Sequence, residues 1–132
     1  MSDFTIENLR GVEDSAPKFG FDEIQEARFA RGALDADATG LSYHRLKPGR
    51  RQGFGHRHVD AEEVYVVLSG SGRIRLGDEI REITALDAIR VAPDVVRAFE
   101  GGPDGLELIA FGPHHDGDGE LLPDFWPADP GT

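Results

Sequence analysis

The sequence predicts a single all-β domain, built as a sandwich or a barrel. First, β-branched and aromatic residues dominate short runs from Glu62 onward, as in "EEVYVVL". Second, turn formers separate these runs at the spacing of about 8–12 residues that is typical of sandwiches and barrels. Third, the chain has 17 Gly and 8 Pro, which favours many short turns over long helices. A length of 132 residues allows one hydrophobic core and is too short for two.

The elements follow from these patterns in chain order. Residues 27–47 alternate on both sides of the turn-rich "DADATG" and predict a hairpin. The later expected strands cover residues 62–68, 73–76, 80–83, 87–93, 95–101 and 106–112, with turns at "SGSG" (69–72), "GDE" (77–79) and "GGPDG" (101–105). The expected organisation is therefore an N-terminal arm (1–26), a barrel (27–112) and a C-terminal arm (113–132). In the C-terminal arm, four apolar residues are expected to anchor onto the barrel or a neighbouring subunit: Leu121, Leu122, Phe125 and Trp126.

Composition narrows the possible partners. With 25 acidic and 14 basic residues the net charge is −11, so nucleic acid and anionic membranes would be repelled. The chain has no Cys, which excludes disulfides and thiol catalysis. It shows no signal-peptide pattern and no long apolar run. We therefore expect a cytoplasmic protein whose partner is a small molecule, with no nucleic-acid or membrane partner.

Two histidines and a glutamate form the most informative pattern in the chain. His56 and His58 are two residues apart, so on a strand both side chains lie on one face. A gap of residues 59–62 allows the chain to turn, and Glu63 then begins the next strand. We expect Glu63 to lie opposite the histidines across an antiparallel pair. Two imidazoles and a carboxylate form a set suited to a divalent first-row metal.

This pattern resembles the first motif of the cupin superfamily, His-x-His followed by Glu and later Gly, which here are His56, His58, Glu63 and Gly70. The stretch "LDAIRVAPDVVRAF" (86–99) resembles the second motif by position. Arg97 stands where that motif has its third metal-ligating histidine. The resemblance covers roughly residues 40–112. It implies a double-stranded β-helix, or jelly-roll barrel, with one pocket inside, and it implies a homodimer, since cupins are often dimers.

Arg97 leaves two alternatives open for the metal. Arginine keeps its proton and has no lone pair to offer a metal. It could instead pair with a buried Glu63 and take the place of the ion's charge, leaving donors for an anionic ligand. Alternatively, the two histidines and Glu63 hold a weak or exchangeable ion of iron, nickel, zinc or manganese, because some iron sites need only these three ligands. Arg97 would then bind the carboxylate of a substrate.

The remaining candidate residues surround the same expected pocket. By alternation, Tyr65 and Phe99 share the inner face with Glu63 and Arg97 and would line the pocket. His44 is a further candidate ligand if it faces inward, or else a half-buried barrel histidine. Three functions remain open: a metal-dependent dioxygenase, isomerase or decarboxylase of a small acid, a metal-free module that binds or senses a small anion, and a dimerisation scaffold with a vestigial pocket.

Overall fold

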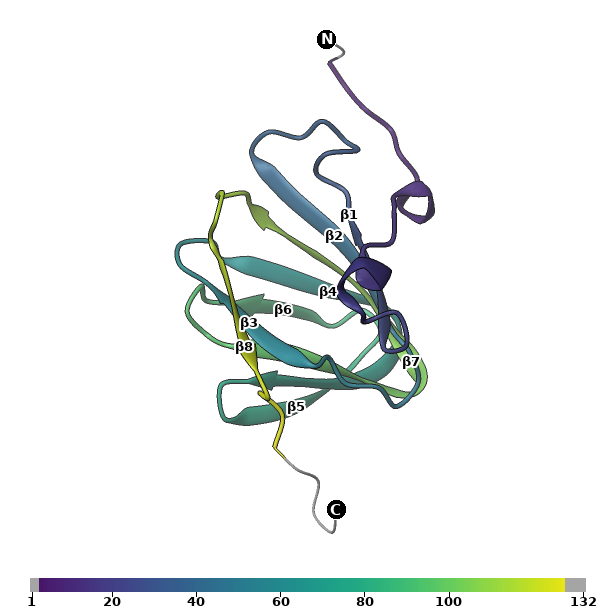
Figure 1. The fold of residues 1–132 in the computed structure, drawn as a ribbon, viewed down its shortest axis with the longest axis vertical. Coiled ribbons are helices and arrows are strands. Elements are labelled where there is room, and N and C mark those ends of the chain that lie inside the picture. The colour runs from purple at the N-terminus through teal and green to yellow at the C-terminus, as the bar shows by residue number, and fades with distance from the viewer. Residues whose placement is uncertain (1–2, 128–132) are drawn as a thin grey trace.

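The computed structural model describes residues 3–127, and the predicted all-β class is confirmed (Figure 1). Two single-turn 3-10 helices, η1 (Leu9–Gly11) and η2 (Ala16–Phe19), precede eight strands. The strands are β1 (Gln25–Phe29), β2 (Thr39–Leu46), β3 (Phe54–His58), β4 (Glu63–Leu76), β5 (Glu79–Thr84), β6 (Ala88–Val91), β7 (Arg97–Pro113) and β8 (Gly119–Pro123). Within residues 3–127, no helix is long and apolar enough to cross a membrane. The outermost residues of both predicted arms, 1–2 and 128–132, lie outside the described range.

The two long strands, β4 and β7, form the centre of the barrel. They pair with each other antiparallel, while β7 also pairs with β2 and β3, and β4 also pairs with β5 and β6. β1 and β2 form the predicted hairpin. Alternate inward-facing residues of these strands make the hydrophobic core. Its members are Leu46, Tyr65, Val67, Ile74, Ile83, Val91, Phe99, Leu106, Leu108 and Ala110.

Two predicted turns, at residues 69–72 and 101–105, are wrong, because both segments lie within long strands. The β4–β7 ladder shifts register between Val67 and Ser69 and again between Gly70 and Gly72. Bulges of this kind bend a strand without ending it. Glycine permits them because the two backbones approach closely: a Cβ at Gly70 would lie 2.2 Å from the carbonyl oxygen of Gly105.

This close approach makes Gly70→Ala a test of the bend. The φ angle of Gly70 is +78° and the added Cβ would meet backbone, so strain and overpacking act together. We expect the free energy of unfolding to fall by about 2 kcal/mol or more, measured by urea denaturation. Gly11→Ala is the control, because nothing lies within 4 Å of its Cβ position. Equal stability of the two variants would contradict this account of the bend.

The C-terminal segment is part of the sheet. β8 pairs antiparallel with β3, and the two strands lie side by side across the front of the barrel in Figure 1. Beyond β8, the guanidinium carbon of Arg75 lies 4.2 Å from the centre of the Phe125 ring, and that of Arg51 lies 5.1 Å from the centre of the Trp126 ring. These two predicted anchors therefore pack on the protein's own barrel.

Candidate metal centre and barrel cavity

Glu63 meets His56 and His58 inside the barrel, although the expected direct pairing of their strands is wrong. β3 is hydrogen-bonded to β7 and β8, whereas β4 pairs with β5, β6 and β7. The carboxylate therefore reaches the histidines from a strand that is not the neighbour of β3. Glu63 Oε1 lies 3.4 Å from His56 Nε2 and 3.6 Å from His58 Nε2.

The three side chains are close enough to hold one metal ion. One ligand atom from each lies within 4.8 Å of the others. Both ring nitrogens of His58, Nδ1 and Nε2, are buried and find no hydrogen-bond partner among the described residues. An unpartnered buried nitrogen is unfavourable unless something else occupies its lone pair. The donor set of two imidazoles and one carboxylate therefore fits a divalent first-row metal.

Arg97 lies directly behind this cluster and is completely buried. It is the register partner of His56 across the β3–β7 ladder. Its Nη2 donates to Glu63 Oε1 at 3.1 Å and its Nε donates to the hydroxyl of Tyr65 at 3.0 Å. Its Nη1 donates to the backbone oxygens of Pro93 and Val95. The guanidinium is thus held by four acceptors of the protein itself.

Glu63 remains ionised in this setting. Burial raises the pKa of its carboxyl, but the contacts with His56, His58 and Tyr65 lower the pKa by more than burial raises it. The pKa of Glu63 therefore lies well below the usual range. The Tyr65 hydroxyl donates a hydrogen bond to Glu63 Oε1. Burial and the charge of Glu63 raise the pKa of Tyr65 well above its usual value, so this phenol keeps its proton. The cluster therefore presents a charged carboxylate, as a metal site requires.

A cavity of about 300 Å³ opens in front of Glu63, His56 and Tyr65. Its remaining walls are mostly apolar, with four phenylalanines at positions 19, 21, 29 and 54, together with Ala16, Ala27, Ala110 and Leu121. The polar members are Gln25, Ser42, His44 and Gln52, with Gly119 completing the wall. Neither Arg97 nor Phe99 is among the lining residues. Phe99 packs against Tyr65, with ring centres 4.9 Å apart.

His44 faces the cavity, which the sequence could not decide. Its Nε2 shares a hydrogen bond of 2.8 Å with the Ser42 hydroxyl, and its ring meets Phe29 edge-on. Its Nδ1 is buried without a hydrogen-bond partner among residues 3–127. Burial, reinforced by the nearby His56 ring, lowers the pKa of His44 to about 4. The ring is therefore neutral at physiological pH.

The low pKa of His44 predicts a specific loss of stability in acid. In the unfolded chain this group binds a proton near pH 6.5, and in the folded protein only near pH 4. Stability therefore falls as the pH drops from about 6.5 to 4, by at most about 3 kcal/mol. The contribution of Glu63 is lost only below its ordinary pKa of 4.5.

We expect His44→Gln to flatten the dependence of unfolding free energy on pH between 6.5 and 4.5 in metal-free protein. His114→Gln is the control, since His114 lies outside this cavity and contacts Asp116. Denaturant titrations at several pH values measure the effect. An unchanged slope in His44→Gln would contradict the assignment.

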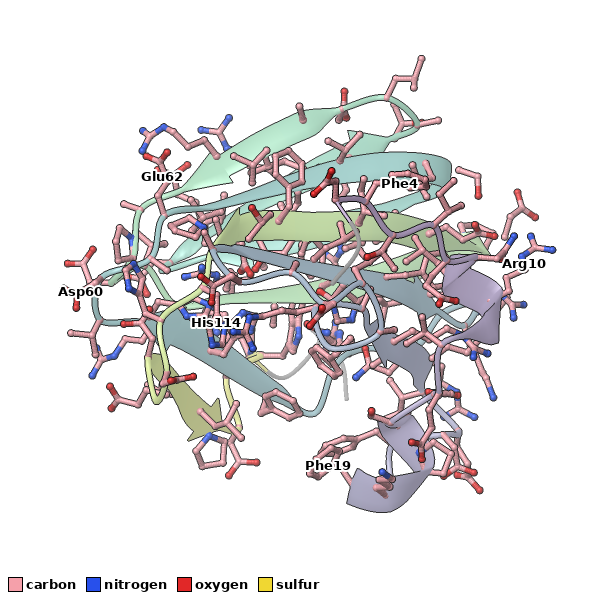
Figure 2. The ribbon with its side chains drawn as sticks, turned by 90° about the horizontal axis from the view of Figure 1, so that it is seen from above. Phe4, Arg10, Phe19, Asp60, Glu62 and His114 are labelled. Atoms are coloured by element: carbon pink, nitrogen blue, oxygen red, sulfur yellow. The ribbon has the colours of Figure 1, made fainter. Side chains whose placement is uncertain are left out.

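A second opening of about 350 Å³ approaches the cluster from a more polar side. His58 and Glu63 line it together with Glu62, His114 and Asp118. Figure 2 shows Asp60, Glu62 and His114 on one side of the molecule, away from Phe19. Glu63 lines both hollows. The cluster of His56, His58 and Glu63 therefore lies between a mostly apolar cavity and a less apolar opening.

Sequence reasoning missed several of these residues. Phe21 lies in the predicted N-terminal arm and Phe29 in the predicted hairpin, yet both residues line the cavity. Gln52 and Gln25 are buried and hydrogen-bonded to each other across the cavity wall. Asp118, from the predicted C-terminal arm, is buried beside His58. Only contacts between distant segments bring these side chains to the site, and no local pattern marks them.

Neither a protein-family model nor a curated protein sequence matches this chain. Solved structures do match over nearly the whole length. A cupin protein from Bacteroides fragilis has a TM-score of 0.69 at 22% identity, covering 89% of each chain. The polyketide cyclase RemF from Streptomyces resistomycificus has a TM-score of 0.73 at 19% identity, covering 96% of this chain and 89% of that one.

A third similar structure is an uncharacterised protein with a double-stranded β-helix domain from Klebsiella pneumoniae. It has a TM-score of 0.71 at 16% identity and covers 92% of this chain and 98% of that one. These likenesses define the class: the chain is a small β-barrel with the cupin fold. The predicted double-stranded β-helix is confirmed. The neighbours include an enzyme and a protein without a stated function, so the fold by itself does not give the activity.

Proposed function

We propose that this protein binds one small, mostly apolar molecule in the barrel cavity, beside a weakly held divalent ion of iron, nickel, zinc or manganese. His56, His58 and Glu63 would hold the ion. The observation that carries the proposal is the buried, unpartnered Nε2 of His58 at 3.6 Å from the Glu63 carboxylate. Arg97 shares that carboxylate, which supports an exchangeable ion over a tight one.

The lining of the cavity supports a flat ligand. The rings of Phe21, Phe29 and Phe54 offer apolar surfaces, which favour an aromatic or otherwise planar body. The volume of about 300 Å³ suits a molecule of one or two rings. The unpartnered Nδ1 of His44 would pair with one polar group of such a ligand.

The charges in the cavity link the ligand to the metal. Glu63 is negative and Arg97 positive, so the pair is neutral, and Arg97 already donates to four protein acceptors. A bound divalent ion would supply positive charge and open coordination positions to an anionic ligand. We therefore propose that an anionic group binds only when the metal is present. Dioxygenase, isomerase or decarboxylase chemistry on a small acid would use the same three ligands and the same cavity.

A metal-free binding module is the second candidate. It is favoured by the hydrogen bond of 3.1 Å from Arg97 Nη2 to Glu63 Oε1, which neutralises the carboxylate without an ion. In that case the cavity would prefer an uncharged ligand, because the described residues that line it include no lysine or arginine.

The two candidates are separated by calorimetric titration with benzoate and with uncharged benzyl alcohol, before and after loading with Mn²⁺. The proposal expects benzoate to bind only the loaded protein. Binding of benzyl alcohol that is unaffected by Mn²⁺, without benzoate binding, would support the metal-free module. Absence of binding by either probe in both states would support a scaffold with a vestigial pocket.

A further inference from the structure

Asp118 is a buried carboxylate that the C-terminal segment brings to the cluster. It lies just before β8, and its side chain is 6% exposed. Oδ1 accepts the backbone N–H of Asp60 at 2.9 Å, and Oδ2 accepts that of Ala61 at 3.0 Å. Its backbone oxygen accepts the N–H of Val59. These three contacts fix the carboxylate over the loop that joins β3 to β4.

The same carboxylate lies against one ring nitrogen of His58. Asp118 Oδ2 is 3.3 Å from His58 Nδ1, while His58 Nε2 is 3.6 Å from Glu63 Oε1. The ring therefore lies between two carboxylates. A neutral imidazole carries one N–H and one lone pair, and a metal-binding histidine donates its other N–H to a carboxylate or carbonyl. Nδ1 makes no aligned hydrogen bond among the described residues, but a fixed carboxylate 3.3 Å away, nearer than Glu63 is to Nε2, favours the proton on Nδ1 and leaves the Nε2 lone pair on the side of Glu63.

We propose that Asp118 is a positioning residue that sets the orientation and tautomer of His58, so that Nε2 serves as the metal ligand. This inference rests on the proposed metal function. If Asp118 has this role, the C-terminal segment that carries Asp118 and β8 is part of the metal site. β8 holds Asp118 in place, since Gly119 pairs with His58 and Glu120 accepts two hydrogen bonds from Arg57 across the β3–β8 ladder.

The test combines Zn²⁺ affinity with the tautomer of His58. In ¹⁵N-labelled, Zn²⁺-loaded protein, long-range ¹H–¹⁵N correlation should place the His58 proton on Nδ1 and the metal on Nε2. Asp118→Asn should weaken Zn²⁺ binding by about 10–100-fold. In metal-free protein, where no ion fixes the tautomer, it should move the His58 proton in part from Nδ1 to Nε2. Asp116→Asn is the matched control, because Asp116 lies in the same loop but its side chain is exposed and contacts His114. It should change the affinity by less than about twofold.

Several outcomes would overturn the proposal. If the native protein carries the His58 proton on Nε2, the proposal is overturned. This result needs no variant, so it holds even if Asp118→Asn fails to fold. Unchanged affinity in Asp118→Asn would also contradict it. Weaker Zn²⁺ binding, with the tautomer of metal-free Asp118→Asn unchanged, would mean that Asp118 acts through the loop amides of Asp60 and Ala61 and not through His58.

Failure of the proposed function is distinguishable from failure of this inference. If the native protein binds no Zn²⁺, the metal proposal fails. The tautomer can still be measured in metal-free protein at alkaline pH, where imidazole rings are neutral. A proton on Nδ1 there supports the role of Asp118, and a proton on Nε2 overturns it.

Discussion

Replacement of Arg97 by alanine is expected to lower the free energy of unfolding by about 3–5 kcal/mol, the range for breaking a buried ion pair from one side. The side chain is completely buried, and its loss removes the cationic partner of Glu63. It also leaves the backbone oxygens of Pro93 and Val95 and the Tyr65 hydroxyl without this donor. Urea denaturation of metal-free protein at neutral pH measures the change.

Arg81→Ala is the control for this prediction. Arg81 also pairs with a glutamate, Glu79, but both side chains are mostly exposed, so its loss should change stability by less than about 1 kcal/mol. If Arg97→Ala were as stable as Arg81→Ala, the buried network around Glu63 would contribute little to the fold. The role of Arg97 in holding that carboxylate would then be rejected.

Replacement of His58 by alanine is expected to weaken binding of a divalent ion by more than about 100-fold. Loss of an outer-shell partner already lowers metal affinity by about 10–100-fold, and His58 supplies one of only three ligands in the cluster. The fold should tolerate the change, because removing this ring also removes an unpartnered buried nitrogen. Competition with a chromogenic chelator measures the affinity.

His115→Ala is the matched control, since His115 is exposed on the same polar side and is not a member of the cluster. The affinity of His115→Ala for the divalent ion should stay within about twofold of the native value. Equal loss in both variants would mean that the ion binds at the polar opening and not at His56, His58 and Glu63.

Local patterns predicted the residues of the cluster well. Period-two alternation placed Tyr65 and Phe99 on the inner face, and both are buried. The spacing of His56 and His58 placed both rings on one face, and they lie close to Glu63. These predictions succeeded because side chains alternate between the two faces of a strand whichever strand it pairs with.

Features that depend on distant partners could not be predicted in the same way. Glycine is typical of turns and of bulges alike, so the sequence predicts a chain reversal at Gly70, where the structure has a bend packed against Gly105. β8 is short and rich in turn formers, and only pairing with β3 makes it a strand. Asp118 is about sixty residues from His58 in sequence, and that pairing brings the two together.

We propose that His56, His58 and Glu63 hold a divalent ion although Arg97 stands where the cupin motif has its third metal-ligating histidine. Equilibrium dialysis of untagged protein against Mn²⁺, Fe²⁺, Ni²⁺ and Zn²⁺, followed by elemental mass spectrometry, tests it directly, beside His58→Ala and Arg97→His. The account predicts about one ion per native chain and almost none in His58→Ala. A native chain as empty as His58→Ala, with only Arg97→His loaded, would contradict it and would show that the guanidinium has replaced the ion.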